Sequence, residues 1–300
     1  MKALYPFESH FIDRNGLNYH YLDEGKGDPV VMVHGNPSWS FYYRNLASTL
    51  KANYRVIVPD HIGCGLSDKP DASSYSFTLK ERVDDLEALL DSLHINKNIT
   101  LVVHDWGGMI GMAFASRYPD RIARLVILNT GAFHLPAAKK FPLSLRICRN
   151  TKLGAFLIQG MNAFARGAAK VGCKRNPMNK ELKDAYCSPY DSWQNRLATL
   201  RFVQDIPLKP GDSGFDLVSG VANALNLFAE TPMIICWGEL DFVFDLHFLK
   251  EWQRRFPKAE VHSFPDCGHY ILEDAKDEVI PLITAFLQKN PLKSEKNEPR

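Results

Sequence analysis

An aspartate stands where an apolar segment meets a pair of glycines. Residues 99–103 are apolar, His104 and Asp105 follow, and Trp106 with Gly107-Gly108 opens the next segment. This order predicts a sharp strand-to-helix turn that presents Asp105 in a cleft. The N-terminus of the new helix is expected to favour the ionised carboxylate. Such a carboxylate can displace a leaving group from a saturated carbon, or open a strained ring, and form an ester with the enzyme.

A second turn is expected to supply hydrogen-bond donors beside this carboxylate. The sequence His34-Gly35-Asn36-Pro37 follows the apolar residues 29–33. In this layout, the backbone N–H groups of Asn36 and Trp106 are predicted to form an anion hole. The Asn36 amide and the Trp106 indole are two further donors for a leaving anion. The alternative is that residues 34–35 are only a tight turn and Trp106 only a core side chain.

A base and an orienting acid are predicted from the last two strand ends. His269 lies in a glycine-containing loop after the last strand, and Asp241 follows the strand before it. The order Asp105, Asp241, His269 is that of nucleophile, acid and base in hydrolases. The acid would hold the histidine and stabilise its imidazolium form. Asp245 and Glu239 are rivals for the acid, although either would also serve as a surface charge or helix cap.

Other polar residues are expected to be structural. His104 precedes the nucleophile and should point away from the cleft, while His34 should brace its own loop. Residues 59–70 are rich in glycine and proline, which predicts a loop at the mouth of the site without a catalytic residue. No metal-binding spacing such as HExxH is present. We therefore expect neither a metal nor a cofactor.

The composition limits the class of protein. The chain has 300 residues, is 45% hydrophobic and carries a formal net charge of +2, which gives no reason to expect a nucleic-acid partner. Its six cysteines are scattered without a CxxC pair, as expected for reduced thiols in the cytoplasm. Residues 1–10 lack the apolar core of a secretion signal. No apolar run is long enough to span a membrane.

Strand-like and helix-like segments alternate along much of the chain. A half-exposed antiparallel strand is predicted at 17–22, and buried parallel strands at 29–34, 54–59, 99–104, 123–129, 233–238 and 260–264. A helix is predicted over 78–93, with Thr78 as its cap. The pattern predicts a doubly wound α/β core. We expect this core at 1–133 and 231–290, an inserted helical cap at 134–230 and a polar tail at 291–300.

The cap has an unusual charge distribution. Residues 134–180 contain ten lysines and arginines but no aspartate or glutamate, and the basic residues are mixed with apolar ones. One interpretation is a solvated helical surface. The other is a docking face for an acidic partner or a membrane surface, with a chain-like substrate entering beneath it.

The motifs together resemble the haloalkane dehalogenase family of the α/β-hydrolase fold. Residues 34–39, 60–70 and 104–108 are the most similar segments, and the likeness extends from about residue 7 to residue 286. In that family an aspartate attacks the carbon that bears the halogen, and a histidine activates water to cleave the ester. The resemblance implies these roles for Asp105 and His269, and halide binding by Trp106 and Asn36. Because residue 129 is an asparagine, it implies Asp241 as the acid.

The sequence of the predicted cap is similar to a narrower group of enzymes. Residues 185–196 and 201–208, with 126–130 and 162–164, are similar to the β-lactone decarboxylases of bacterial long-chain olefin biosynthesis. Those enzymes convert a dialkyl β-lactone to a cis-alkene and carbon dioxide. The resemblance implies that Asp105 attacks the ring, at either the saturated carbon or the carbonyl. It also implies a small hydrophobic substrate beneath the cap and other olefin-biosynthesis enzymes as partners.

Several alternatives remain open at this point. Haloalkane dehalogenation would use the same residues, and epoxide hydrolysis shares the aspartate mechanism. Epoxide opening usually needs two cap phenols, whereas the candidates Tyr186 and Tyr190 are expected to pack or lie at the surface. A serine-type esterase is disfavoured because the turn holds an aspartate. A binding or assembly module without turnover is a different class, but all three catalytic positions hold competent residues.

Overall fold

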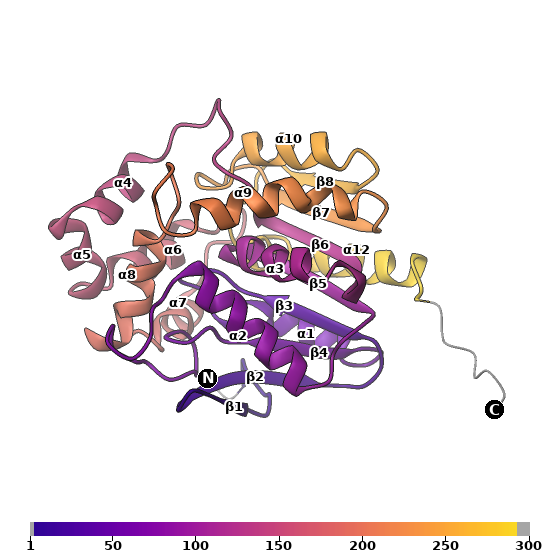
Figure 1. The fold of residues 1–300 in the computed structure, drawn as a ribbon, viewed down its shortest axis with the longest axis horizontal. Helices are drawn as coiled ribbons and strands as arrows, with labels where there is room; N and C mark the ends of the chain where they lie inside the picture. Colours follow the sequence, from indigo (N-terminus) through magenta and orange to yellow (C-terminus); the bar gives the residue numbers. More distant parts are fainter. Residues whose placement is uncertain (1–2, 293–300) are drawn as a thin grey trace.

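An eight-stranded sheet forms the centre of the computed structural model, which describes residues 3–292 (Figure 1). The strands are β1 (His10–Arg14), β2 (Leu17–Glu24), β3 (Pro29–Val33), β4 (Arg55–Pro59), β5 (Ile99–Asp105), β6 (Ile122–Thr130), β7 (Met233–Gly238) and β8 (Glu260–Phe264). Their order in the sheet is β1-β2-β4-β3-β5-β6-β7-β8. β2 pairs antiparallel with both β1 and β4, and all other pairs are parallel. The predicted α/β class is confirmed.

Helices cover both faces of this sheet. Those outside the β6–β7 segment are α1 (Arg44–Leu50), α2 (Leu79–Ser92), α3 (Trp106–Arg117), α10 (Leu246–Arg255), α11 (Ile271–Asp274) and α12 (Lys276–Lys289), with the 3₁₀ turns Ser40–Tyr43 and Pro119–Arg121. Alternate residues of a strand face opposite ways. Val31 therefore packs in the same core as α2, α3 and α10, while Val30 packs in the core that includes α1 and α12.

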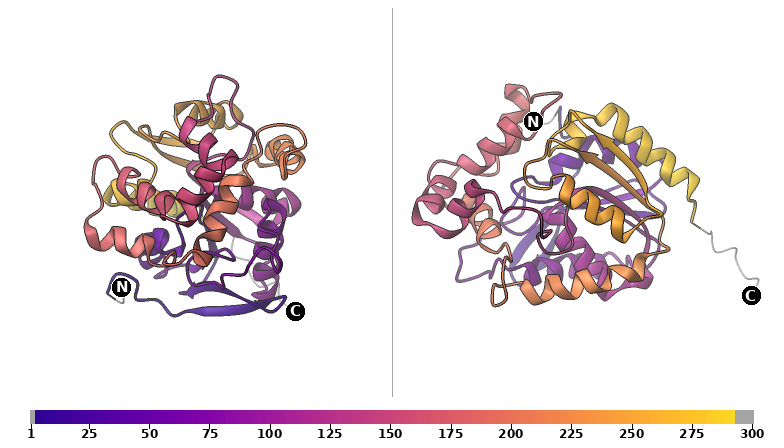
Figure 2. Two further views of the ribbon diagram at one scale, coloured as in Figure 1. Left: turned by 90° about the vertical axis from the view of Figure 1, so that its left-hand side faces the viewer. Right: turned by 90° about the horizontal axis from the view of Figure 1, so that it is seen from above.

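The segment between β6 and β7 contains helices and no strand. It includes α4 (Leu143–Asn150), α5 (Lys152–Gln159), α6 (Ala163–Val171), α7 (Lys180–Cys187), α8 (Leu197–Gln204) and α9 (Phe215–Ala224), with the 3₁₀ turns Gln194–Arg196 and Leu225–Phe228. α4 to α8 lie together at one end of the molecule, whereas α9 lies along the sheet beside α3 (Figures 1 and 2). We call the part from α4 to α8 the cap; the domain boundaries given above stay predictions.

Sequence and structure differ at the edge of the sheet. The sequence pattern missed β1, because this short edge strand carries only two apolar residues and has no fully buried position. β2 was predicted to be half exposed, yet its residues 19–22 are all buried. α2 starts as predicted, because the Thr78 hydroxyl accepts a hydrogen bond from the backbone N–H of Glu81. Most of the predicted tail, residues 293–300, lies outside the described residues.

Candidate active site

Asp105 occupies a strained turn between β5 and α3. Its backbone angles are φ 53° and ψ −127°, which an aspartate adopts only when its surroundings impose them. The neighbouring glycines leave the necessary room. A Cβ atom on Gly35 would lie 2.0 Å from Oδ1 of Asp105, and one on Gly107 would lie 1.9 Å from the carbonyl oxygen of Val33. The turn has the geometry that the sequence predicts for a nucleophile elbow.

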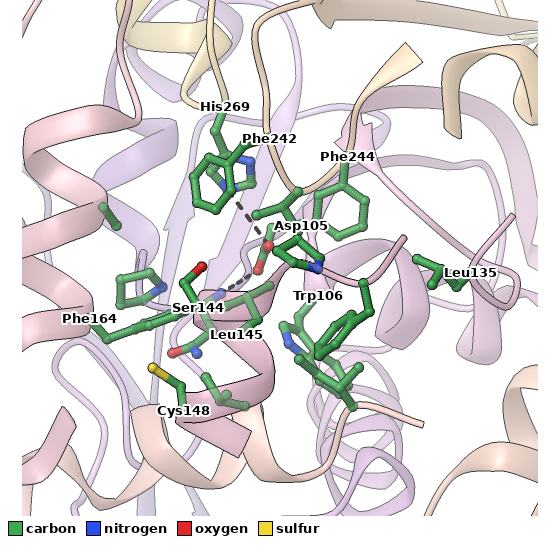
Figure 3. Close-up of a pocket in the computed structure, with 18 of the residues that line it drawn as sticks. Asp105, Trp106, Leu135, Ser144, Leu145, Cys148, Phe164, Phe242, Phe244 and His269 are labelled. Atoms are coloured by element: carbon green, nitrogen blue, oxygen red, sulfur yellow. Dashed lines mark hydrogen bonds and ion pairs between the residues drawn. The ribbon is translucent and has the colours of Figure 1, made fainter. Parts of the chain in front are cut away.

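The two oxygens of Asp105 have different surroundings. Oδ1 accepts a hydrogen bond of 2.6 Å from the backbone N–H of Asn36, while Oδ2 lies 3.6 Å from Nε2 of His269 (Figure 3). Burial raises the pKa of the Asp105 carboxyl, and this outweighs the opposite effects of His269 and of the Asn36 and Trp106 N–H groups. The N-terminus of α3 favours the ionised carboxylate as the sequence predicts, but the effect of burial is larger.

His269 bridges the two carboxylates. Its Nδ1 lies 2.7 Å from Oδ2 of Asp241, and its ring is largely buried. Burial lowers the pKa of His269, but the Asp241 and Asp105 carboxylates more than offset this, so that the pKa is raised above its usual value. The imidazolium form is thus favoured beside Asp105. The structure brings together all three residues that the sequence predicted as nucleophile, acid and base.

Asp241 is held by a set of donors that its rivals lack. Its Oδ1 accepts from the backbone N–H groups of Val243 and Phe244, and its Oδ2 from the Asn129 amide at 3.1 Å. The side chain of Asn129 also accepts from the N–H of Gly238, which ties β6 to β7. The sequence identified Asn129 only as an amide in place of a carboxylate. Its contact with Asp241 depends on the pairing of β6 and β7, which no local pattern encodes.

The two rival acids do not reach His269. Glu239 accepts a hydrogen bond from the hydroxyl of Ser263 at 2.6 Å. Asp245 caps α10 through the N–H of His247 and forms an ion pair of 2.7 Å with Lys139. Both therefore serve as a surface charge or a helix cap, the alternative that the sequence left open for them.

Of the two side-chain donors predicted to bind an anion, the Trp106 indole borders the pocket, whereas the Asn36 amide is hydrogen bonded elsewhere. The side-chain amide of Asn36 donates to the carbonyl oxygen of Thr199 in α8 at 3.1 Å, a contact that the sequence could not reveal. By contrast, the indole of Trp106 borders the pocket, and no acceptor in residues 3–292 is hydrogen bonded to its Nε1. The roles of Asn36 and Trp106 as anion donors stay predictions, with Trp106 in the more favourable position.

The remaining polar groups near the turn are structural. Nδ1 of His34 bonds the carbonyl oxygen of Gly35, and its Nε2 accepts from the N–H of His61. His104 is buried away from the pocket, with Nε2 on the carbonyl oxygen of His269. In the loop of residues 59–70, Asp60 is fully buried. Burial would raise its pKa, but the contacts led by that with His20 lower it to about 2.

An apolar pocket of about 300 Å³ lies between the cap and the sheet, with Asp105 and His269 in its wall (Figure 3). Its lining from the cap includes Leu145 and Phe164, and its lining from the core includes Phe244. Sequence analysis did not assign these residues to a pocket wall, because helical periodicity does not distinguish a face that packs from one that lines a cavity. The pocket suits a substrate with hydrocarbon chains.

Tyr186 and Tyr190 do not border this pocket. The Tyr186 hydroxyl donates to Glu273 at 2.6 Å, and the Tyr190 hydroxyl lies 3.4 Å from the carbonyl oxygen of Ser38. Both are buried. Neither can hold an epoxide oxygen over Asp105. In residues 3–292, no three His, Cys, Asp or Glu side chains are grouped as metal ligands, and no helix is long and apolar enough to cross a membrane.

Comparison with known proteins agrees with this geometry. A protein of Shewanella oneidensis named cis-3-alkyl-4-alkyloxetan-2-one decarboxylase is 65% identical, over 96% of this chain and 90% of its own. A protein of the same name from Xanthomonas campestris is 48% identical, over 96% and 98%. Haloalkane dehalogenase 2 of Mycobacterium tuberculosis is 29% identical, over 93% and 95%.

Structural similarity is equally extensive. The crystal structure of haloalkane dehalogenase DatA from Agrobacterium tumefaciens superposes with a TM-score of 0.85 at 24% identity, covering 97% of this chain and all of that one, which establishes the fold. The family model of the alpha/beta hydrolase fold matches residues 28–276. The chain therefore belongs to the alpha/beta hydrolase fold family and, within it, to the group that contains the cis-3-alkyl-4-alkyloxetan-2-one decarboxylases.

Proposed function

We propose that this protein converts a cis-3-alkyl-4-alkyloxetan-2-one, a β-lactone with two alkyl arms, into a cis-alkene and carbon dioxide. The observation that carries this proposal is the 65% identity to the Shewanella protein of that name, against 29% to haloalkane dehalogenase 2 of Mycobacterium tuberculosis. The apolar pocket supports it, because alkyl arms need such a lining.

In the first step, Asp105 opens the ring. Its Oδ1 is held by the Asn36 N–H, which leaves Oδ2 for attack on the saturated carbon that carries the ring oxygen. A new ester bond forms to Asp105 while the bond from that carbon to the ring oxygen breaks. The oxygen then belongs to a free carboxylate on the neighbouring carbon. In this proposal the Trp106 indole and the His269 imidazolium stabilise this negative charge.

In the second step, the carboxylate leaves as carbon dioxide. The carbon–carbon bond to the carboxylate breaks, its electron pair forms the double bond, and the ester bond to Asp105 breaks to restore the aspartate. The two steps consume neither a proton nor water. Inversion in the first step followed by anti elimination in the second keeps the alkyl arms cis. His269, held by Asp241 at 2.7 Å, stabilises the Asp105 carboxylate as it departs.

The second candidate is haloalkane dehalogenation. The observation in its favour is the indole N–H of Trp106, which borders the pocket beside Asp105 and would also stabilise a halide. Asp105 would displace the halide, and His269 would then have to accept a proton from water to cleave the ester. The Asp241 carboxylate, which raises the pKa of His269, would stabilise the imidazolium formed in that step.

A product assay separates the two candidates. The protein is given a cis-dialkyl β-lactone and a bromoalkane of similar size in competition, and alkene, carbon dioxide and bromide are measured. We expect cis-alkene and carbon dioxide in equal amounts and faster than bromide. Asp105→Asn should lose about 10⁴-fold or more of this activity. Absence of alkene, or full activity of the variant, would exclude the proposal.

We also propose a setting for this reaction. Other enzymes of olefin biosynthesis would supply the lactone, and the protein would work in the cytoplasm. All six cysteines are free, which supports a reducing compartment. Copurification of the tagged protein with a lactone-forming enzyme from its own cells tests the first part of this proposal, and fractionation of the cells tests the second.

A further inference from the structure

One surface of the cap combines exposed apolar and basic side chains. We call it the cap face; it is formed by α4, α5, α6 and the turns beside them, at the end of the molecule that faces the viewer in Figure 2, left. Its apolar members are between 37% and 70% exposed: Leu143, Ile147, Leu153, Phe156, Met161 and Val171. Its basic members are also exposed: Lys140, Arg146, Lys152, Arg166, Lys170 and Lys174.

The positive charges of the cap face are not neutralised by any residue that the structure describes. None of the six basic side chains has a hydrogen bond or an ion pair with any described residue, and residues 134–180 include no acidic residue. Other cations of this segment are paired: Lys139 with Asp245, and Arg149 with Asp212. The cap face therefore carries six free positive charges in a chain whose net charge is only +2.

The pocket opens beside the cap face. Four residues of its lining are themselves exposed: Ser144, Ala163, Val171 and Phe242. They lie on α4, on α6 and in the loop after β7, which places the mouth of the pocket at the edge of the cap face. Because the buried wall beyond this mouth is mostly apolar, an apolar molecule that crosses it stays out of water until it reaches Asp105.

We propose that the cap face binds the surface of an anionic lipid membrane and receives the substrate from it. Exposed leucine and phenylalanine side chains would enter the boundary between head groups and acyl chains, while the six cations would face anionic head groups. The delivery of substrate from the membrane rests on the proposed function, because a lactone with two alkyl arms partitions into lipid. Its alkene product would leave by the same route.

A lipid surface fits these observations better than an acidic protein does. The apolar and basic residues are interspersed over three helices, as in amphipathic segments that lie in a membrane interface. A protein interface would have a core depleted in charge with a polar rim around it. In addition, a lipid surface at the mouth of an apolar pocket would let an apolar substrate pass into the pocket directly from the membrane.

Sedimentation with vesicles tests the proposal without any substrate, so that its failure is distinct from failure of the proposed function. The full-length protein is mixed with vesicles of phosphatidylethanolamine and phosphatidylglycerol, or of phosphatidylcholine alone. We expect binding to the anionic vesicles only, and loss of most binding in about 1 M salt. Equal binding to both vesicle types, or to neither, would overturn the proposal. Binding to soluble polyglutamate but not to vesicles would indicate an acidic protein partner instead.

Matched variants locate the binding surface. Arg146→Gln with Lys152→Gln should weaken binding to the anionic vesicles about 25-fold, about fivefold for each cation removed. Lys26→Gln with Lys250→Gln removes the same charge from exposed positions outside the cap face and should change binding little. Leu153→Ser with Phe156→Ser removes two apolar side chains from the cap face and should also weaken binding to the anionic vesicles. Because none of these residues lines the pocket, turnover of a short-chain, water-soluble lactone should be unchanged. Equal losses in the two charge variants would contradict the assignment.

Discussion

Asp241 is a buried carboxylate that orients His269 and raises its pKa. It accepts hydrogen bonds from two backbone N–H groups and from Asn129, so that its remaining contact, with His269, is fixed in direction. Asp241→Asn would offer an amide where His269 needs an acceptor. We expect a loss of about 10³–10⁴-fold in kcat for alkene formation. Glu239→Gln is the matched control and should keep full activity, since within residues 3–292 the Glu239 carboxylate is hydrogen bonded to Ser263 and not to His269.

The pH dependence follows from Asp105. Because burial raises the pKa of its carboxyl above the usual 3.8, protonation removes the nucleophile at a higher pH than for an exposed aspartate. We expect kcat/KM for the lactone to fall on the acid side with an apparent pKa above the usual carboxyl range. A profile that stays flat to a pH below that range would contradict it.

The raised pKa of Asp105 also makes the free energy of unfolding depend on pH. A raised pKa in the folded state means that folding favours the protonated Asp105, so that its stabilisation is present in acid and is lost as the pH rises through the folded-state pKa. Asp105→Asn should therefore increase the free energy of unfolding at pH 7, by about 0.5–2 kcal/mol. This gain should shrink towards zero at a pH below the unfolded-state pKa. Urea unfolding of both proteins at the two pH values measures the difference.

At the scale of elements, the closeness of α3 to β6 depends on glycine. A Cβ atom on Gly108 would lie 1.9 Å from the hydroxyl of Thr130 and 2.7 Å from the carbonyl oxygen of Gly131, so α3 would have to move. Gly108→Ala should cost about 1–3 kcal/mol of stability and reduce activity, because α3 carries Trp106. Gly220→Ala in α9 is the control: nothing lies within 4 Å of its new Cβ, and a gain of about 0.5–1 kcal/mol is expected. Thermal unfolding and kcat of both variants test this.

The positions of the strands and helices also explain which parts of the site could be predicted from the sequence. The nucleophile turn and the loop around Asn36 each follow a buried, mostly apolar strand, whereas the loop of His269 follows β8, which was predicted to be buried but is buried only at Phe264. Local patterns place such strand ends at one edge of a parallel sheet. The contact of the Asn36 amide with Thr199 joins residues 163 positions apart, so no local pattern contains it. The short edge strand β1 was missed for a related reason: its signal comes from pairing with β2.

At the scale of the whole molecule, the pocket arises only where cap and core meet. Its walls come from α4, α5, α6 and α8 on one side and from α3 and the loops after β6 and β7 on the other. Sequence patterns predicted a cap and its basic, apolar composition, but not which of its faces encloses the substrate. That depends on the angle at which the cap packs on the sheet. The chemistry is therefore readable from local motifs, whereas the fit of the alkyl arms is a property of the assembled fold.

Lactones with alkyl arms of different length can test whether the cap determines the fit of the substrate. Ala168 in α6 lines the pocket from the cap, and a larger side chain there takes up space in the pocket while Asp105 and His269 are unchanged. Ala168→Phe should lower kcat/KM about tenfold or more for lactones with long arms, since displaced methylene groups are worth 10–200-fold in such pockets. It should leave lactones with methyl arms nearly unaffected. Ala137→Phe adds the same ring at an exposed position outside the pocket and should change neither. If Ala168→Phe slows long and short substrates equally, the cap does not select by chain length, and the pocket wall formed by α6 acts only as a structural support.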